Sequence, residues 1–250
     1  KKLKKKFYMI IIRIMGLYNN LCWQASSNLE SDDIKRVLKG IAYNIKIAPD
    51  LLSHNFSEDI KISNRKKDIF KVVFLSRISP MKNLDFLIRA LNNVLHSVEL
   101  TILGPKEDLK YWETCKKLIN KLPSHVKIRV EEEVFPEKVQ EKFGMYDLFV
   151  FPTRGENFGH VIPEALSVGT PVLLSDKTPW KEDSLLGLQI LPLKESLWAE
   201  EIDKWSTLSY EKILIRKKAA LSYAYKIDLE NKKSFESNKV LFDYKSSCLN

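Results

Sequence analysis

The segment DLFVFPTRGENFGHVIPEALSVGTPVLLSD, residues 147–176, decides the fold of this chain. It begins with an apolar run that ends in Phe-Pro-Thr and continues through a polar loop. The helical pattern VIPEALSVG then leads to a second apolar run. Two strands separated by a helix of this length pair in parallel through a right-handed crossover. The segment therefore predicts one unit of an α/β fold.

The same alternation extends upstream as far as Ile69. Dense runs of β-branched and apolar residues predict strands, and amphipathic runs between them predict helices. The sequence therefore predicts a doubly wound parallel sheet, in which ligands bind at the carboxyl ends of the strands. The predicted strands span 69–76, 98–104, 126–130, 147–152 and 171–176, and the predicted helices 83–95, 109–122, 137–144 and 161–169. The helix at 83–95 shows five apolar residues on one face, Leu84, Leu87, Ile88, Leu91 and Val94.

Downstream of these strands the sequence predicts helices, at 197–205, 209–225 and 230–244. Trp198, Ile202 and Trp205 fall on one face of the first of them. Helical spacing against a sheet accounts for these side chains as core residues rather than as a ligand-binding cluster.

The chain before the sheet is predicted to belong to a second domain. It reads as strand, helix and strand at 20–26, 27–40 and 42–49, which makes a sheet too small to stand alone. It is therefore expected to be the tail of an incomplete N-terminal α/β domain. The predicted organisation is this tail at 1–49, a polar linker at 50–68, the main domain at 69–228 and a C-terminal helix at 229–250.

Residues 1–18 combine a Lys-rich start, KKLKKK, with an apolar run. The run is shorter than the roughly 20 residues that span a bilayer, and it contains Arg13, so it is not predicted as a transmembrane helix. No small-residue cleavage site follows it, which disfavours a secretory signal. Helical spacing instead predicts an amphipathic helix that either packs on a sheet or lies on an anionic membrane surface. The residues with this spacing are Leu3, Phe7, Ile10, Ile14 and Tyr18.

The composition is that of a folded chain with a basic balance. The 250 residues are 44% apolar, and 41 Lys and Arg against 32 Asp and Glu give a net charge of +9. This charge favours anionic partners, but no nucleic-acid motif accompanies it, so nucleic acid is not an expected partner. The scattered cysteines form no CxxC pair, which suggests neither zinc nor disulfides and fits a reducing cytoplasm. They are Cys22, Cys115 and Cys248.

Two cations follow the strand predicted at 69–76. Arg77 and Lys82 leave the carboxyl edge of the sheet just before a helix, whose start carries a partial positive charge. A diphosphate suits this loop, since Arg offers a planar fork and Lys a point charge. In a chain with 41 basic residues such a pair is common, so a solvated loop is the alternative interpretation.

Two carboxylates follow the strand predicted at 147–152. Glu156 lies in the loop and Glu164 in the first turn of the next helix. Gly159 lets the backbone approach a ligand and leaves the amides of His160 and Val161 to bind anions. Because carboxylates accept hydrogen bonds from hydroxyls, the loop suits a sugar or ribose beside a phosphate. Two other interpretations stay open: the helix dipole alone favours Glu164, or the pair are the acid and nucleophile of a hydrolase.

These segments together resemble a known family. FLSRISPMKNLDFLIRAL, LTILGP, residues 147–176 and the following TPW are similar to the C-terminal domain of the group-one, or family-four, retaining glycosyltransferases of GT-B fold. Glu156 and Glu164 match the E-x7-E signature of that family, with the Arg and Lys loop about 80 residues upstream. The resemblance extends over about Ile69 to Trp180.

The resemblance implies a role for each matching residue. Arg77 and Lys82 are expected to bind the diphosphate of the donor and to stabilise the charge on the leaving nucleotide. Glu156 is expected to face the donor sugar, and with the two cations it makes up the catalytic set. Glu164 is expected to bind the ribose hydroxyls, and Val134, in EEVFPEK, to contact the nucleobase. The other implied substrate-binding residues are Asn157, Phe158, Gly159, His160 and Val161.

The resemblance also implies an activity. The expected enzyme is hexosyltransferase-like and moves a sugar from a nucleotide-sugar donor to an acceptor hydroxyl with retention, in polysaccharide or glycolipid synthesis. The expected acceptor is a saccharide or lipid-linked saccharide, met in the cytoplasm or at the inner membrane face. No Asp-x-Asp motif is present, so neither a metal nor another cofactor is expected.

One departure from the family pattern leaves a second hypothesis open. A complete family member has an N-terminal domain of about equal size with a Gly-rich loop and the acceptor site, and only the last part of that domain is expected here. The alternative is therefore a noncatalytic nucleotide-sugar-binding or partner module that has lost its acceptor domain.

Overall fold

The computed structural model divides the chain into two compact units. One unit comprises residues 1–51 and 229–250, and the other comprises residues 52–228. The predicted linker at 50–68 lies outside the residues that the structure describes. The described residues are 7–8, 10–12, 14–17, 21–38, 44–48, 69–183 and 185–242, the last range without the side chains of 233–238 and 240–242.

The smaller unit contains a two-stranded parallel sheet and a helix. Strands β1 (Trp23–Ala25) and β2 (Ile45–Ile47) pair in parallel, and α2 (Asn28–Leu38) connects them. A capping arrangement fixes the start of α2. The Ser27 hydroxyl accepts a hydrogen bond from the Glu30 amide, and the Glu30 carboxylate accepts one from the Ser26 amide.

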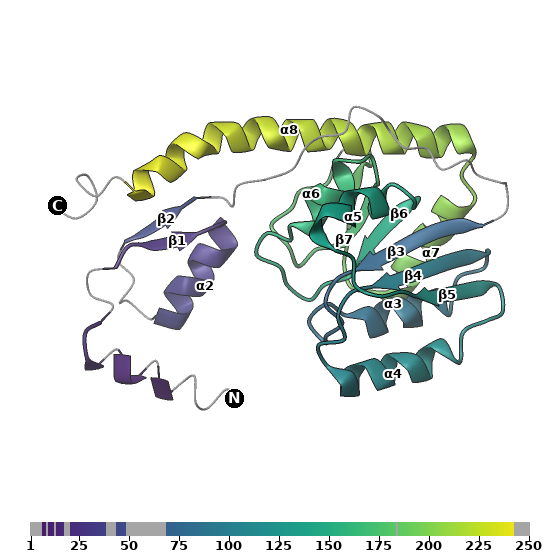
Figure 1. Cartoon of the computed structure of the whole chain (residues 1–250), viewed down its shortest axis with the longest axis horizontal. Helices are drawn as coiled ribbons and strands as arrows, with labels where there is room; N and C mark the ends of the chain where they lie inside the picture. The colour runs from purple at the N-terminus through teal and green to yellow at the C-terminus, as the bar shows by residue number, and fades with distance from the viewer. Residues whose placement is uncertain are drawn as a thin grey trace. The chain divides into compact units, whose positions relative to one another are not determined.

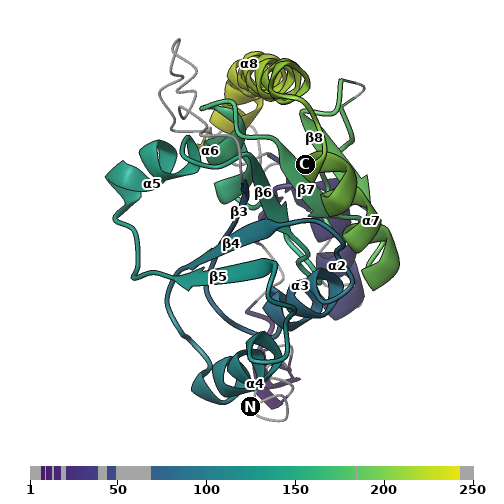
Figure 2. The ribbon, with the colours of Figure 1, turned by 90° about the vertical axis from the view of Figure 1, so that its right-hand side faces the viewer.

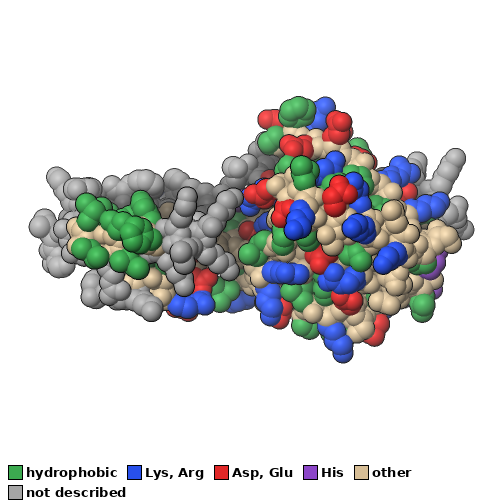
Figure 3. Space-filling model, turned by 90° about the horizontal axis from the view of Figure 1, so that it is seen from below, with side chains coloured by type: hydrophobic (Ala, Val, Ile, Leu, Met, Phe, Trp, Pro, Cys, Tyr) green, Lys and Arg blue, Asp and Glu red, His purple; other side chains and the backbone are tan. Residues whose placement is uncertain are grey.

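The described residues of the N-terminal segment are helical at 7–8, 10–12 and 14. Phe7, Ile10 and Ile14, which were predicted to share the apolar face, are exposed. Figure 3 shows hydrophobic side chains gathered over the described part of the smaller unit. Among the helices of the described residues, none is long and apolar enough to span a bilayer.

The larger unit is built on the predicted doubly wound sheet (Figure 1). Six strands lie in the order β5-β4-β3-β6-β7-β8, and every neighbouring pair is parallel. The strands are β3 (Phe70–Leu75), β4 (Val98–Leu103), β5 (Val126–Val130), β6 (Leu148–Phe151), β7 (Val172–Ser175) and β8 (Leu188–Leu191).

Helices cover both faces of this sheet (Figures 1 and 2). α3, α4 and α7 lie on one face, and α5 and α6 on the other. The helices are α3 (Leu84–Leu91), α4 (Leu109–Ile119), α5 (Pro136–Phe143), α6 (Val161–Leu166), α7 (Glu195–Ser206) and α8 (Tyr210–Phe242). On the face seen in Figure 3, Lys and Arg side chains are interspersed with Asp and Glu over this unit.

The core lies between the sheet and these helices. The five apolar residues predicted to share one face of α3 are all buried, as are Trp198, Ile202 and Trp205 of α7. The ring of Trp198 packs edge-on against Phe86 at 5.5 Å, and its indole N–H donates to the Pro192 carbonyl at 2.9 Å. Helical periodicity therefore identified the buried faces of both helices correctly.

Two features differ from the prediction. The edge strand β8, the four-residue run Leu-Gln-Ile-Leu whose last three residues are half-buried, was not predicted. The two helices predicted at 209–225 and 230–244 are one continuous helix, α8. The residues between them, Lys-Ile-Asp-Leu, contain neither Gly nor Pro, so nothing in the local sequence ends the helix there.

Candidate functional site

The site lies where the strand order of the sheet reverses. From β3 the chain moves outward through β4 and β5, and from the adjacent strand β6 it moves outward the other way through β7 and β8. The loops that leave the carboxyl ends of β3 and β6 therefore diverge and leave a crevice between them. These loops are residues 76–83 and 152–160.

A pocket of about 350 Å³ occupies this crevice. Of the ten predicted site residues, all of which the structure describes, seven line it: Arg77, Lys82, Val134, Glu156, Gly159, His160 and Val161. Leu75, Ser76, Gly104, Pro105, Glu133 and Phe151 complete the lining. The remaining predicted residues, Asn157, Phe158 and Glu164, are not among the lining residues. The fold thus brings the cationic and the acidic loop to one hollow.

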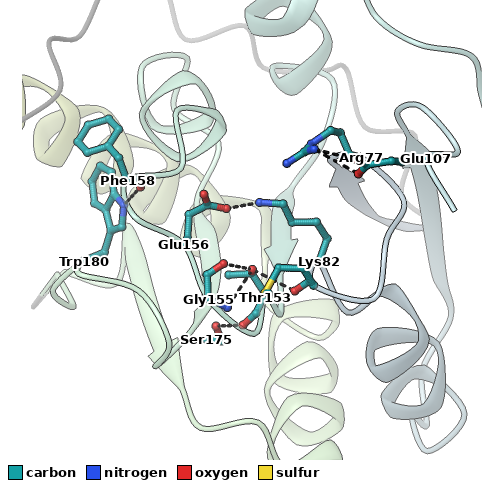
Figure 4. A network of polar contacts seen from close by, with 10 residues as sticks. Arg77, Lys82, Glu107, Thr153, Gly155, Glu156, Phe158, Ser175 and Trp180 are labelled. Carbon is teal, nitrogen blue, oxygen red and sulfur yellow. Dashed lines mark hydrogen bonds and ion pairs between the residues drawn. The ribbon is translucent and has the colours of Figure 1, made fainter. Parts of the chain in front are cut away.

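Lys82 and Glu156 form an ion pair across the crevice (Figure 4). Their side chains are only 11% and 19% exposed, and the Lys82 ammonium also lies 5.3 Å from the centroid of the Phe151 ring. Removal of one partner of such a buried pair leaves the other charge uncompensated. The two side chains are therefore held in place by one another.

Arg77 has a different environment. Its guanidinium donates to both carboxylate oxygens of Glu107, at 3.1 and 3.2 Å (Figure 4). Both side chains are at least half exposed, and exposed ion pairs contribute little to stability. An anionic ligand in the pocket can therefore replace Glu107 as the partner of Arg77 at little cost.

Asn83 ties the two loops together and was not predicted from the sequence. Its side-chain amide donates to the Pro152 carbonyl, and its amide oxygen accepts from Nε of Arg154, both at 2.9 Å. The Arg154 amide in turn donates to the Met81 carbonyl at 2.8 Å. Asn83 is buried and has φ of 63°, in the left-handed region that Asn adopts more easily than most residues.

Two glycines allow the loops to come this close. Gly104 has φ of 126°, and a Cβ there would lie 2.2 Å from the carbonyl oxygen of Ser76. Gly159 has φ of 78°, and a Cβ there would lie 2.8 Å from Cγ of Glu156. Both positions therefore require glycine, because of the backbone conformation as well as the space.

The predicted residues outside the lining have other surroundings. Phe158 is half-buried, with its ring 5.5 Å from that of Trp180 and 5.0 Å from that of His160. Asn157 is exposed. Glu164 is half-buried in the first turn of α6, and this burial raises the pKa of its carboxyl to about 7.

A second hollow of about 550 Å³ adjoins the first. The two share Gly104, Pro105, Glu133 and Val134, so together they form one elongated depression. The side chain of Phe135 lines the second hollow and is 73% exposed. The remaining lining residues are Lys106, Glu131, Glu132 and Pro136.

A doubly wound parallel sheet with a pocket at the reversal of strand order places the larger unit in the class of α/β domains whose ligand site lies at the carboxyl ends of the strands. The comparison with known families is more specific. Residues 55–183 match the family described as glycosyl transferases group 1, and the chain belongs to this family.

Curated relatives match part of the chain. An "uncharacterized glycosyltransferase", MJ1607 of Methanocaldococcus jannaschii, is 28% identical over 153 residues, which cover 59% of this chain and 37% of the relative. D-inositol 3-phosphate glycosyltransferase 1 of Catenulispora acidiphila is 30% identical over 115 residues, which cover 42% and 28%. The chain therefore spans about a third of the length of these relatives.

Solved structures of glycosyltransferases share the fold. Anabaena HepE, in complex with UDP and glucose, superposes with a TM-score of 0.71 at 20% identity, over 92% of this chain and 67% of that one. S. aureus TarM superposes with a TM-score of 0.67 at 18% identity, over 88% and 43%. These neighbours confirm the predicted GT-B type of α/β fold.

Proposed function

We propose that this protein binds a nucleotide sugar and transfers the sugar, with retained configuration, to the hydroxyl of an acceptor. The observation that carries the proposal is the single pocket into which Arg77, Lys82 and Glu156 converge from two loops far apart in the sequence. Family membership and the glycosyltransferases among the relatives support the reaction class.

In this proposal the cations serve the diphosphate. Arg77 exchanges its ion pair with Glu107 for one with the diphosphate. Lys82 keeps its contact with Glu156 and also donates hydrogen bonds to the phosphate oxygens. Both groups then stabilise the negative charge that accumulates on the nucleoside diphosphate as the bond to the sugar breaks. Because side chains meet this charge, the proposal includes neither a metal nor another cofactor.

Glu156 serves the sugar and the adjoining hollow serves the nucleoside. The Glu156 carboxylate accepts hydrogen bonds from sugar hydroxyls, and backbone amides of residues 159–161 face the sugar or phosphate. Val134 lies in the wall shared by both hollows, where the nucleobase leaves the diphosphate pocket. The exposed ring of Phe135 offers the base a stacking surface. Glu164 is assigned to the ribose hydroxyls.

The proposed acceptor is a saccharide or a lipid-linked saccharide, in polysaccharide or glycolipid synthesis. The proposed location of the protein is the cytoplasm, including the inner face of the membrane. The Lys-rich start of the chain and the exposed apolar residues Phe7, Ile10 and Ile14 support contact with an anionic membrane surface through residues 1–18.

A second candidate is a noncatalytic module that binds a nucleotide sugar. It is favoured by one observation, that the lining residues of both hollows all lie within residues 52–228. A unit that holds the donor by itself can bind a nucleotide sugar without transferring it.

Calorimetric titration with uridine, guanosine and adenosine diphosphate sugars tests both candidates. The transferase predicts binding of one of them followed by hydrolysis or by transfer to an added saccharide. Binding without turnover would favour the module, and binding of none of the three would contradict both.

A further inference from the structure

The loop that follows β7 braces the loop that carries Glu156. Residues 175–180 hold residues 153–158 at three successive points, two of which are drawn in Figure 4. The three hydrogen bonds run from the Ser175 hydroxyl to the Thr153 carbonyl, from the Glu156 amide to the Lys177 carbonyl and from the Trp180 indole to the Phe158 carbonyl.

Trp180 makes the last of these contacts and is the only one of the three that adds the packing of an aromatic ring. Its ring is half-buried, packs against the core of the larger unit and lies 5.5 Å from the ring of Phe158. A buried indole N–H needs an acceptor, and here the acceptor is the Phe158 carbonyl. Ring packing and hydrogen bond together fix both the side chain and the backbone of Phe158.

The fixed carbonyl determines the direction of a group in the pocket wall. The Phe158 carbonyl and the Gly159 N–H belong to one planar peptide unit, so an anchored carbonyl sets the orientation of the N–H. Gly159 lines the pocket in a left-handed conformation, and the space beside its Cα, where a Cβ would stand, is taken by the side chain of Glu156. A rotation of this peptide unit would therefore displace both Gly159 and Glu156.

We propose that Trp180 is a positioning residue for the sugar end of the donor. This inference rests on the proposed function. Trp180 is not among the residues that line the pocket, and it acts through the Phe158–Gly159 peptide and through Glu156. Arg77 comes from the other loop and pairs with Glu107, so this cation of the diphosphate end does not depend on Trp180.

Trp180→Phe tests the inference because it keeps one aromatic ring against Phe158 and removes the pyrrole part of the indole together with its N–H donor. Amide hydrogen exchange over residues 153–161 is expected to become about tenfold faster, the effect of one lost hydrogen bond. Calorimetry with UDP-glucose and UDP as probes is expected to show about tenfold weaker binding of UDP-glucose and less than about threefold weaker binding of UDP. A purely structural role would weaken both ligands equally.

Trp198→Phe is the matched control. Trp198 also donates its indole N–H to a backbone carbonyl, that of Pro192 at 2.9 Å, but it lies in the buried core on α7. Its substitution is expected to lower the free energy of unfolding while exchange in residues 153–161 and the ratio of the two ligand affinities stay as in the wild type.

The outcomes separate this inference from the proposed function. If the wild type binds UDP-glucose and Trp180→Phe shows unchanged loop exchange, or an equal loss for UDP and UDP-glucose, only the role of Trp180 is overturned. If the wild type binds neither UDP, UDP-glucose nor any other nucleotide sugar, the proposed function falls and the role of Trp180 toward a donor falls with it.

Discussion

Lys82 and Glu156 define the chemistry of the site at the scale of single residues. Each lies in a pocket that reaches solvent only partly, and each neutralises the other. A buried charge pair is poor evidence for stability, because the cost of removing two charges from water offsets their attraction. The pair matters here for its geometry. It holds the Lys82 ammonium where the proposed diphosphate would bind and the Glu156 carboxylate where the proposed sugar hydroxyls would bind.

Substitution of the cations is the first prediction. Arg77→Ala and Lys82→Ala are each expected to weaken binding of a nucleoside diphosphate by about 1 to 3 kcal/mol, the range for charge-assisted hydrogen bonds. Calorimetric titration measures the change. Lys71→Ala is the control, because Lys71 is exposed on the same strand, β3, near its amino end. Unchanged affinity in both pocket variants would remove these cations from the site.

The buried carboxyl of Glu164 gives a pH dependence. Burial raises its pKa from 4.5 to about 7, so between these values the folded chain holds a proton that the unfolded chain releases. Its contribution to stability is therefore greatest below about pH 4.5 and is lost as the pH rises through about 7. Glu164→Gln removes this loss. After a discount for partial exposure, the variant is expected to be about 1 to 2 kcal/mol more stable than wild type at pH 8 and equal to it near pH 4.5.

Urea denaturation at the two pH values measures this difference. Glu137→Gln is the control, since Glu137 occupies the first turn of α5 and is exposed. The control is expected to show no gain at pH 8. A gain in the free energy of unfolding of Glu164→Gln that is the same at both pH values would contradict a raised pKa for the Glu164 carboxyl.

At the scale of elements, the loops after β3 and β4 lie against each other at a distance that only glycine permits at position 104. The β3 loop lies against the β4 loop, where the Ser76 amide donates to the Leu103 carbonyl and the Ile78 amide to the Pro105 carbonyl. Gly104 sits between these contacts with φ of 126°. The position of Arg77 therefore depends on the loop after β4 as well as on its own.

Gly104→Ala is expected to destabilise the chain by about 2 to 4 kcal/mol, because its Cβ would meet the Ser76 carbonyl in a conformation that L-residues rarely adopt. Gly155→Ala is the matched control in the β6 loop, where an added Cβ would meet only Sδ of Met81, at 3.8 Å. Its expected effect is within about 0.5 kcal/mol. Equal midpoints of urea denaturation for the two variants would contradict this account of the loop.

Much of the larger unit follows from sequence periodicity alone. The central strands are dense apolar runs, so β3, β4, β6 and β7 were predicted within one residue of their observed bounds at each end. The helical stripe predicted α3 at its start, but the helix ends at Leu91, four residues before the predicted end. β8 was missed although three of its four residues are apolar, because a run of four residues is too short to show a period. The length of α8 was missed because a drop in apolar periodicity does not end a helix when no Gly or Pro is present.

The site was predictable to the extent that it depends on strand ends. Arg77, Lys82 and Glu156 were singled out because each follows a strand, and parallel strands present their carboxyl ends at one edge. No local sequence pattern shows that β3 and β6 are neighbours in the sheet. The side-chain contacts that join their loops, from Arg154 to Asn83 and from the Thr153 hydroxyl to the Met81 carbonyl, therefore escaped prediction.

At the scale of the whole molecule, the reversal of strand order explains why Lys82 and Glu156, which lie 74 positions apart in the sequence, form an ion pair. The larger unit supplies every lining residue of both hollows. Donor binding, as proposed above, is therefore expected to be a property of residues 52–228.

A crystal structure of the chain with UDP-glucose, or with the nucleotide sugar that titration selects, tests this account most directly. We predict the diphosphate between Arg77 and Lys82, the sugar against Glu156 and Gly159, and the base beside Val134. A ligand bound elsewhere on the molecule, with the ion pair of Lys82 and Glu156 unchanged and the crevice empty, would contradict it.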